Sequence, residues 1–177
     1  MRGYNAKKFV EDQIKEIKQV IGNEKAVIAV SGGVDSSTCA VLTHQAIGEN
    51  LVCVTLDDAF MREGEPEKVA ELLFQPPLNL PMRIEKVQER FLKALSGLKD
   101  AEEKRKAFRK TFYETLSDIA KREESQFLVQ GTILADVIET KGGIKTQHNV
   151  LEQMGISTRE LYGFKVVEPL VSLLKWQ

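Results

Sequence analysis

A short stretch near the amino terminus combines residue types that bind anions. After the apolar run Ala-Val-Ile-Ala-Val at 26–30, the chain reads Ser-Gly-Gly-Val-Asp-Ser-Ser over residues 31–37, and a helical pattern follows. Two adjacent glycines allow a tight turn and a close approach of the backbone to a ligand. Amides at the start of the following helix, together with the serine hydroxyls, can donate hydrogen bonds to phosphate. The stretch therefore predicts a phosphate-binding loop between a strand and a helix.

Asp35 is an unexpected neighbour for a phosphate group, because like charges repel. A divalent cation removes the conflict, since Mg²⁺ is commonly held by one or two carboxylates together with phosphate oxygens. The loop contains neither the Walker A pattern nor GxGxxG. A tight turn whose serine or aspartate only caps the helix is the structural alternative. A lone Gly-Gly pair would favour that alternative, whereas the full seven-residue string favours an anion site.

Apolar runs alternate with amphipathic stretches along the chain. Apolar runs, a pattern typical of strands buried on both faces, predict strands over 26–30, 51–58 and 127–131. Less continuous apolar patterns predict strands over 82–87 and 164–170. Apolar residues at spacings of three and four, with Gly and Pro at the expected ends, predict helices over 6–21, 36–47 and 65–74, and a long helical tract broken at Gly97. This alternation predicts an α/β fold, a doubly wound, Rossmann-like parallel sheet with helices on both faces.

Polar side chains follow three of the predicted strands. They are the loop 31–37, the pair Asp57 and Asp58, and the region from Gln130 onward. Sheets of this type bind ligands beyond the carboxyl ends of the strands, near the point where the strand order reverses. We therefore expect the three polar clusters to meet at one edge of the sheet.

Composition excludes several classes of protein. The chain has 177 residues, of which 42% are hydrophobic and 29% charged, and these values are ordinary for one globular domain. Its net charge of −1 supplies no field that would attract nucleic acid. No apolar run approaches the ~20 residues of a membrane span, so we expect no membrane partner and a cytoplasmic location. Cys39 and Cys53 lie in apolar contexts without a CxxC pair, which predicts buried thiols and no zinc site.

The string SGGVDSS resembles the pyrophosphate-binding loop of the ATP pyrophosphatases, the N-type PP-loop superfamily. Its members adenylate an acceptor and release pyrophosphate. Four further stretches resemble the ATP pyrophosphatase domain of GMP synthetase: RFLKALSGLKDAEEKRKAFRKTFYE, QGTILADVIET, IKTQHNV and VVEPLVSLLK. The resemblance implies an adenine nucleotide alpha hydrolase-like domain over residues 26–177, preceded by an amino-terminal helix within 1–25. The family's C-terminal domain has no counterpart before Gln177, so we expect the domain to be cut at its carboxyl end.

The resemblance also implies a set of nucleotide and metal ligands. The β,γ-phosphates of ATP would be held by the loop residues Ser31, Gly32, Gly33, Val34, Asp35, Ser36 and Ser37. Mg²⁺ would be held by Asp35 and by Asp136, which matches the acidic residue that the family uses on the metal. Glu139 follows Asp136 by three residues, and residues at this spacing share a helix face. Solvated carboxylates at a helix start are the structural alternative for this pair.

Lys145 and His148 fall in a segment that is similar to the mobile lid of the family. Basic groups there meet ATP and the departing pyrophosphate, and a closing loop can exclude water. We therefore expect residues 140–160 to form a mobile lid, and Lys145 and His148 to join Asp136 and Glu139 as catalytic residues. His44, on the helix after the glycine loop, is predicted to be an ordinary surface or packing residue.

In GMP synthetase, ATP activates the purine 2-oxygen of XMP, and ammonia from a glutamine amidotransferase domain or subunit displaces AMP. The resemblance thus implies ATP and Mg²⁺ as cofactors, XMP or another small acceptor as substrate, and an amidotransferase subunit and a homodimer mate as partners. Two departures bear on the acceptor: Gln147 replaces a lid histidine, and Leu-Glu-Gln-Met at 151–154 replaces Gly-Gly-Leu-Pro. A PP-loop enzyme for another acceptor (tRNA modification or an amide ligase) and an ATP-binding module without turnover remain alternatives. The absence of CxxC pairs argues against a tRNA-modifying enzyme.

Overall fold

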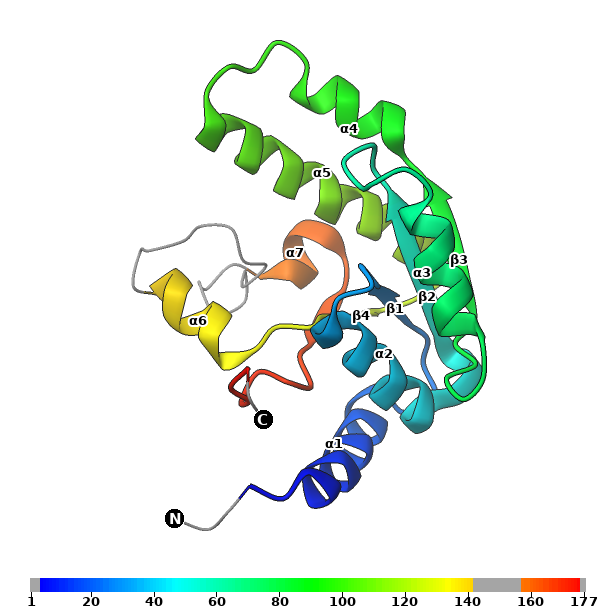
Figure 1. Ribbon diagram of the computed structural model, residues 1–177. Coiled ribbons are helices and arrows are strands. Elements are labelled where there is room, and N and C mark those ends of the chain that lie inside the picture. Colours follow the sequence, from blue (N-terminus) through cyan, green and yellow to red (C-terminus); the bar gives the residue numbers. More distant parts are fainter. Residues whose placement is uncertain (1–3, 142–156, 176–177) are drawn as a thin grey trace.

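A parallel sheet forms the middle layer of the protein, with helices covering both of its faces (Figure 1). The computed structural model describes residues 4–141 and 157–175. Within these residues the strands lie in the order β3-β2-β1-β4-β5, and every neighbouring pair is parallel. The strands are β1 (Ala26–Ala29), β2 (Leu51–Asp57), β3 (Met82–Lys86), β4 (Phe127–Val129) and β5 (Lys165–Val167). The predicted doubly wound parallel sheet is confirmed.

The helices follow the predicted pattern with small differences. They are α1 (Ala6–Ile21), α2 (Val34–Ile47), α3 (Glu65–Phe74), α4 (Gln88–Leu95), α5 (Ala101–Arg122), α6 (Leu134–Lys141) and α7 (Thr158–Tyr162), with a 3₁₀ turn at Gly48–Asn50. The second helix begins at Val34 rather than Ser36, because Gly33 takes the extended conformation of an N-cap. The strands predicted over 127–131 and 164–170 are shorter, with three residues each.

Side-chain alternation along the buried strands divides the core between the two faces of the sheet. Ile28 of β1 and Cys53 of β2 pack with buried residues of α1, α2 and α3. Their neighbours Val27 and Val54 pack instead with buried residues of α5. Because successive side chains of a strand point to opposite faces, one apolar run supplies both cores. No helix in residues 4–141 and 157–175 is long and apolar enough to cross a membrane.

The strand order reverses between β1 and β4. From β1 the chain moves outward through β2 to β3, then returns across the sheet and places β4 on the other side of β1. Backbone pairing continues just past two strands, since the Val30 amide donates to the Val54 carbonyl and the Gln130 amide donates to the Val167 carbonyl. In open α/β sheets, ligands bind beyond the carboxyl ends of the strands at such a reversal. The loop 31–37 and the residues from Gln130 onward follow the two strands that flank it.

Both cysteines are fully buried, as expected. Cys39 in α2 and Cys53 in β2 have no exposed surface. Burial raises the pKa of each thiol from 9.0 to about 12, and the nearby charge of Asp35 adds to the effect at Cys39. Deep burial and a raised pKa describe unreactive structural thiols.

We predict that stability falls as the pH rises from 9.0 to about 12, in part because of these thiols. In that range the unfolded chain loses the thiol protons while the folded protein keeps them. The unfolded state then binds fewer protons, so the free energy of unfolding decreases with pH. Denaturant titrations across this range should show a smaller decrease in the Cys39→Ala/Cys53→Ala variant than in the wild type. An identical decrease in both proteins would contradict the assignment.

Candidate functional site

The loop after β1 turns sharply before it enters α2. Gly32 adopts φ +79°, a left-handed conformation that L side chains rarely take. A Cβ atom at this position would also meet Val69 of α3 at 2.6 Å. Glycine is therefore required at position 32 both by the backbone conformation and by the packing of α3.

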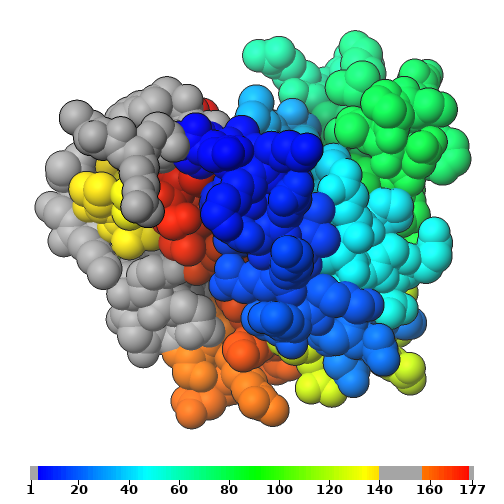
Figure 2. Space-filling view, turned by 90° about the horizontal axis from the view of Figure 1, so that it is seen from below, coloured from blue at the N-terminus to red at the C-terminus, as the bar shows by residue number. Residues whose placement is uncertain are grey.

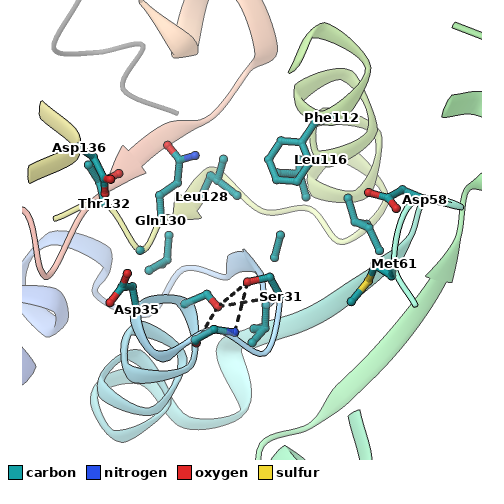
Figure 3. A pocket seen from close by; sticks show the side chains of 17 residues that line it. Ser31, Asp35, Asp58, Met61, Phe112, Leu116, Leu128, Gln130, Thr132 and Asp136 are labelled. Atoms are coloured by element: carbon teal, nitrogen blue, oxygen red, sulfur yellow. Dashed lines mark hydrogen bonds between the residues drawn. The ribbon is translucent and has the colours of Figure 1, made fainter. Parts of the chain in front are cut away.

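The hydroxyl groups of the loop bond to one another and fix its shape. The Ser31 amide donates to Oγ of Ser36 at 3.3 Å, and the two hydroxyls lie 3.2 Å apart. The Ser36 hydroxyl donates to the Gly33 carbonyl at 3.2 Å (Figure 3). The N-cap residue of α2 is Gly33, which has no side chain to bond to the first-turn amides. The first-turn amides of a helix have no partner within the helix, so those of α2 remain suited to an anion.

Gly131 packs against the amino end of α2. It directly follows Gln130, whose amide ends the backbone pairing of β4. A Cβ atom at Gly131 would lie 2.8 Å from the Ser36 nitrogen and 2.9 Å from the Asp35 carbonyl carbon. Real Cβ atoms are not found so close to backbone atoms. The absence of a side chain at position 131 thus allows the end of β4 to touch the first turn of α2.

A cavity of about 430 Å³ opens at this contact, at the reversal of strand order between β1 and β4 (Figure 3). Its size falls within the range typical of small-molecule sites. Its walls come from the ends of β1, β2 and β4, the loops after them, α2, α5 and α6. The lining residues are Ala29, Val30, Ser31, Gly33, Asp35, Ser36, Leu56, Asp58, Met61, Phe112, Leu116, Leu128, Val129, Gln130, Gly131, Thr132 and Asp136.

The two ends of the cavity differ in polarity. Figure 3 shows Asp35, Thr132 and Asp136 on one side. On the opposite side, Phe112 and Leu116 of α5 lie across from Met61, and the carboxylate of Asp58 lies at the margin of this side. A ligand that fits this arrangement has one charged end and one flat apolar end.

The carboxylates on the polar side have identifiable partners. Asp35, in the first turn of α2, accepts hydrogen bonds from Nζ of Lys175 at 2.7 and 2.9 Å. Asp136, in the first turn of α6, accepts a bond from the Ile133 amide at 2.9 Å. The bond from the Ile133 amide is the return half of a capping box, so Asp136 caps α6 and also lines the cavity.

The two aspartates after β2 have different contacts. Asp57 accepts two bonds from the side-chain amide of Gln88, at 2.9 and 3.0 Å. Asp58 accepts a bond from the Phe60 amide at 2.9 Å and lines the cavity. The expectation that the three polar clusters meet at one sheet edge is confirmed, with Asp58 rather than Asp57 facing the cavity.

The cavity wall contains Ser31, Gly33, Asp35, Ser36 and Asp136 from the predicted set. Other members of that set lie beside the wall rather than in it. Val34 is 74% exposed at the first position of α2. Gly32 and Ser37 shape the turn and the helix start, and Glu139 lies one turn along α6.

Lys145 and His148 lie outside the described residues, and so does most of the predicted lid. Their roles stay predictions.

The structure adds contacts that the sequence did not predict. Gln130 donates through its side-chain amide to the hydroxyl of buried Tyr113 at 3.0 Å, which orients it at the cavity wall. Phe112 forms part of the apolar side. Lys175 reaches Asp35 across 140 positions of sequence. In the sequence, Lys175 is marked only by its place at the end of the stretch VVEPLVSLLK. The resemblance of that stretch implied no role for the lysine.

The described residues contain no group of three or more histidine, cysteine or acidic side chains able to hold a metal on their own. A metal site in this cavity would therefore need a ligand to complete it. One or two carboxylates plus phosphate oxygens form the usual Mg²⁺ site of phosphate-binding proteins. Asp35 and Asp136 supply oxygen ligands of that kind, and a cation already fits beside Asp35, because the Lys175 ammonium is there.

Comparison of the sequence with known proteins identifies one family and similar proteins within it. The PP-loop domain family matches residues 6–177. A subunit of the glutamine-hydrolyzing GMP synthase of Methanopyrus kandleri is 51% identical over 172 residues, which are 97% of this chain and 53% of that subunit. The corresponding subunit from Sulfurisphaera tokodaii, which has the same name, is 47% identical over 172 residues, or 97% of this chain and 45% of that subunit. The chain thus spans about half the length of the curated relatives it matches.

Solved structures agree on the fold. The NH3-dependent NAD synthetase of Campylobacter jejuni superposes with a TM-score of 0.68 over 98% of this chain and 70% of that protein. The two sequences are 19% identical, so this likeness concerns the fold alone.

We predict that Gly131→Ala destabilises the fold more than Gly33→Ala does. The added methyl at position 131 meets backbone atoms at 2.8 and 2.9 Å, whereas at position 33 it meets only Ser31 Oγ, at 3.4 Å. Overpacking of this kind costs about 1–3 kcal/mol. Denaturant unfolding of the two variants beside the wild type measures the difference. Equal stability of Gly131→Ala and wild type would show that β4 and α2 do not touch as described.

Proposed function

Because the chain belongs to the PP-loop domain family, we propose that it binds ATP with Mg²⁺ in the cavity beside residues 31–37. We propose further that it transfers the adenylyl group of ATP to an acceptor with release of pyrophosphate. The observation that carries this proposal is the polarity of the cavity. Its polar side joins a helix amino end to two carboxylates, and its other side is apolar and partly aromatic.

The polyphosphate of ATP fits the polar side. Amides at the amino end of α2 and the turn of the loop offer hydrogen-bond donors, and the positive end of the helix dipole favours anions. Asp35 and Asp136 would hold Mg²⁺, since both carboxylates line the cavity and carboxylates together with phosphate oxygens are its usual ligands. When bound, Mg²⁺ supplies neutralisation of charge on the phosphate oxygens.

The purine ring fits the apolar side. Phe112, Leu116 and Met61 offer an apolar surface there, and Asp58 adds a polar group at its margin. With the ring on this side and the terminal phosphates at α2, the α-phosphate lies between them. An acceptor oxygen that attacks the α-phosphorus breaks the bond to the β-phosphate, and pyrophosphate leaves with the bonding electron pair. The helix amino end then faces the charge that develops on pyrophosphate.

The acceptor is inferred from the relatives. Two proteins that are 47% and 51% identical to this chain are named as subunits of GMP synthase, which supports XMP as the acceptor and GMP as the product. The words "glutamine-hydrolyzing" in that name support a partner that supplies ammonia from glutamine. In this scheme ammonia attacks the activated purine carbon and AMP leaves. Glu139, Lys145 and His148 remain proposed participants, and assembly with a second copy remains a proposal.

We predict that Asp35→Asn weakens binding of ATP in the presence of Mg²⁺ roughly ten- to hundredfold, because a charged ligand of the metal is lost. Isothermal titration calorimetry with a non-hydrolysable ATP analogue, with and without Mg²⁺, measures this change. Asp12→Asn is the matched control, since Asp12 is an exposed carboxylate of α1 that pairs with Lys8. Equal, metal-dependent affinity in Asp35→Asn and wild type would refute the metal role of Asp35.

The reaction itself is tested by following the products from ATP. With XMP and ammonia present, we expect AMP and pyrophosphate in equal amounts. ADP and phosphate as the products would contradict cleavage at the α-phosphate. Pyrophosphate release that ignores XMP would indicate another acceptor, and tight ATP binding without any release would indicate a binding module.

A further inference from the structure

The side chain of Gln130 lies in the middle of the cavity wall. Figure 3 shows it between Asp136 on the charged side and Phe112 on the apolar side. Under the proposed function, the terminal phosphates of ATP lie against the charged side and the purine ring lies against the apolar side. The α-phosphate, which is the group that reacts, then lies between them and beside Gln130.

The backbone of Gln130 is held on both sides. Its amide donates to the Val167 carbonyl at 2.9 Å, and its carbonyl accepts a bond from Sγ of Cys39 at 3.5 Å. The segment that follows β5 is held in turn, because the Leu134 amide donates to the Leu173 carbonyl at 2.9 Å. Figure 2 shows that segment, in red, between α6 in yellow and α1 in blue. The side chain of Gln130 thus starts from a fixed point.

The hydroxyl of Tyr113 holds the side-chain amide of Gln130. Nε2 of Gln130 donates to this hydroxyl at 3.0 Å, and Oε1 lies 3.5 Å from it. Tyr113 is fully buried, and its ring stacks on that of Tyr162 with the centroids 5.2 Å apart. Burial raises the pKa of the Tyr113 hydroxyl, so it keeps its proton at neutral pH. An amide nitrogen carries two hydrogens, and the bond to Tyr113 uses one of them, so the other can be donated to a ligand.

The charges around the cavity create a need for such a donor. The charged side chains that line it, within the described residues, are the aspartates at 35, 58 and 136. Negative charge develops on the α-phosphate oxygens when the acceptor attacks, and a fixed hydrogen-bond donor at that point stabilises it. Among the described lining residues, Gln130 alone has a side chain with N–H donors.

We propose that the side-chain amide of Gln130 donates a hydrogen bond to a non-bridging oxygen of the α-phosphate, and that Tyr113 is the positioning residue that holds this amide in place. This inference rests on the proposed function, because it needs ATP in the cavity. The helix amino end and the metal hold the terminal phosphates, whereas Gln130 contacts the phosphate at which the reaction takes place.

Two ligands separate the α-phosphate from the terminal phosphates in a test of Gln130→Met, which keeps the side-chain length and removes the amide. With Mg²⁺ present, α,β-methylene-ATP should bind about tenfold more weakly, because one hydrogen bond to a charged oxygen is lost. Pyrophosphate with Mg²⁺ occupies only the site of the terminal phosphates, so its affinity should stay within about twofold of wild type. Calorimetry measures both affinities. Gln126→Met is the matched control, since Gln126 is an exposed glutamine just before β4.

Tyr113→Phe tests the positioning role, because it removes the hydroxyl and keeps the ring. The affinity for α,β-methylene-ATP should fall about threefold, since the amide of Gln130 remains but is no longer held. In the Gln130→Met background, the same tyrosine change should have no further effect on this affinity. Tyr162→Phe is the control, because it removes a hydroxyl from the same aromatic stack. A tyrosine that only stabilised the fold would weaken both ligands in either background.

A measurement on the wild type needs no substitution. In NMR spectra of the isotope-labelled chain, the side-chain amide signals of Gln130 should shift more with α,β-methylene-ATP than with pyrophosphate, both with Mg²⁺. Equal or smaller shifts with the nucleotide would overturn the proposal.

Equal nucleotide affinity in Gln130→Met and wild type would also overturn it, and so would equal weakening of both ligands. These results leave the proposed function intact. Additive losses in the double variant would overturn the role of Tyr113. If the wild type binds neither ligand, the proposed function fails, and this inference fails with it. Thermal unfolding of each variant establishes that the compared proteins are folded.

Discussion

The contact between Gly131 and the first turn of α2 is the constraint on which the site depends. A single methyl group at position 131 would lie within 3 Å of two backbone atoms of α2. Because there is none, the residues that follow β4 can lie directly against the loop that follows β1. The two sides of the strand reversal then meet without a gap, and the cavity forms just beyond them. The charged side of the cavity combines Asp35 from one side of this contact with Thr132 and Asp136 from the other.

Burial of the short strands on both faces also holds the site in place. β1 has four residues and β4 has three, yet both are buried on two faces by α5 on one side and by α1, α2 and α3 on the other. The loops at their carboxyl ends therefore start from fixed points. The loop 31–37 is tightened further by its own serine hydroxyls and by Val69 against Gly32. A preformed anion site costs little reorganisation when a ligand arrives.

Local patterns in the sequence were sufficient for most of the fold. Continuous apolar runs identified the central strands, and the i, i+3, i+4 spacing identified the long helices. The errors lie where tertiary contacts decide the length of an element. The runs at 127–131 and 164–170 are apolar enough for longer strands, but each forms three strand residues before the chain leaves the sheet. α7 has five residues, too few for a periodic signal.

Local patterns in the sequence also predicted part of the candidate site. The glycines, serines and aspartate of one loop lie together in sequence, and their types alone indicate phosphate and metal. The contact of Lys175 with Asp35 and the bond between Gln130 and Tyr113 form only through the path of the chain in space. No local pattern marks a lysine that reaches an aspartate 140 residues away. Phe112 and Leu116 lie on the apolar face of α5, and only the fold shows that this face also lines a cavity.

The central claim is that the terminal phosphates of ATP bind where the loop after β1 meets the residues after β4. Backbone amide NMR spectra of the isotope-labelled chain, titrated with a non-hydrolysable ATP analogue and Mg²⁺, test it most directly. We expect the largest amide shifts within residues 31–37 and 130–132, stretches that contain residues lining the cavity. Saturation with nucleotide that leaves these amides unchanged, with the largest shifts elsewhere in the chain, would contradict it.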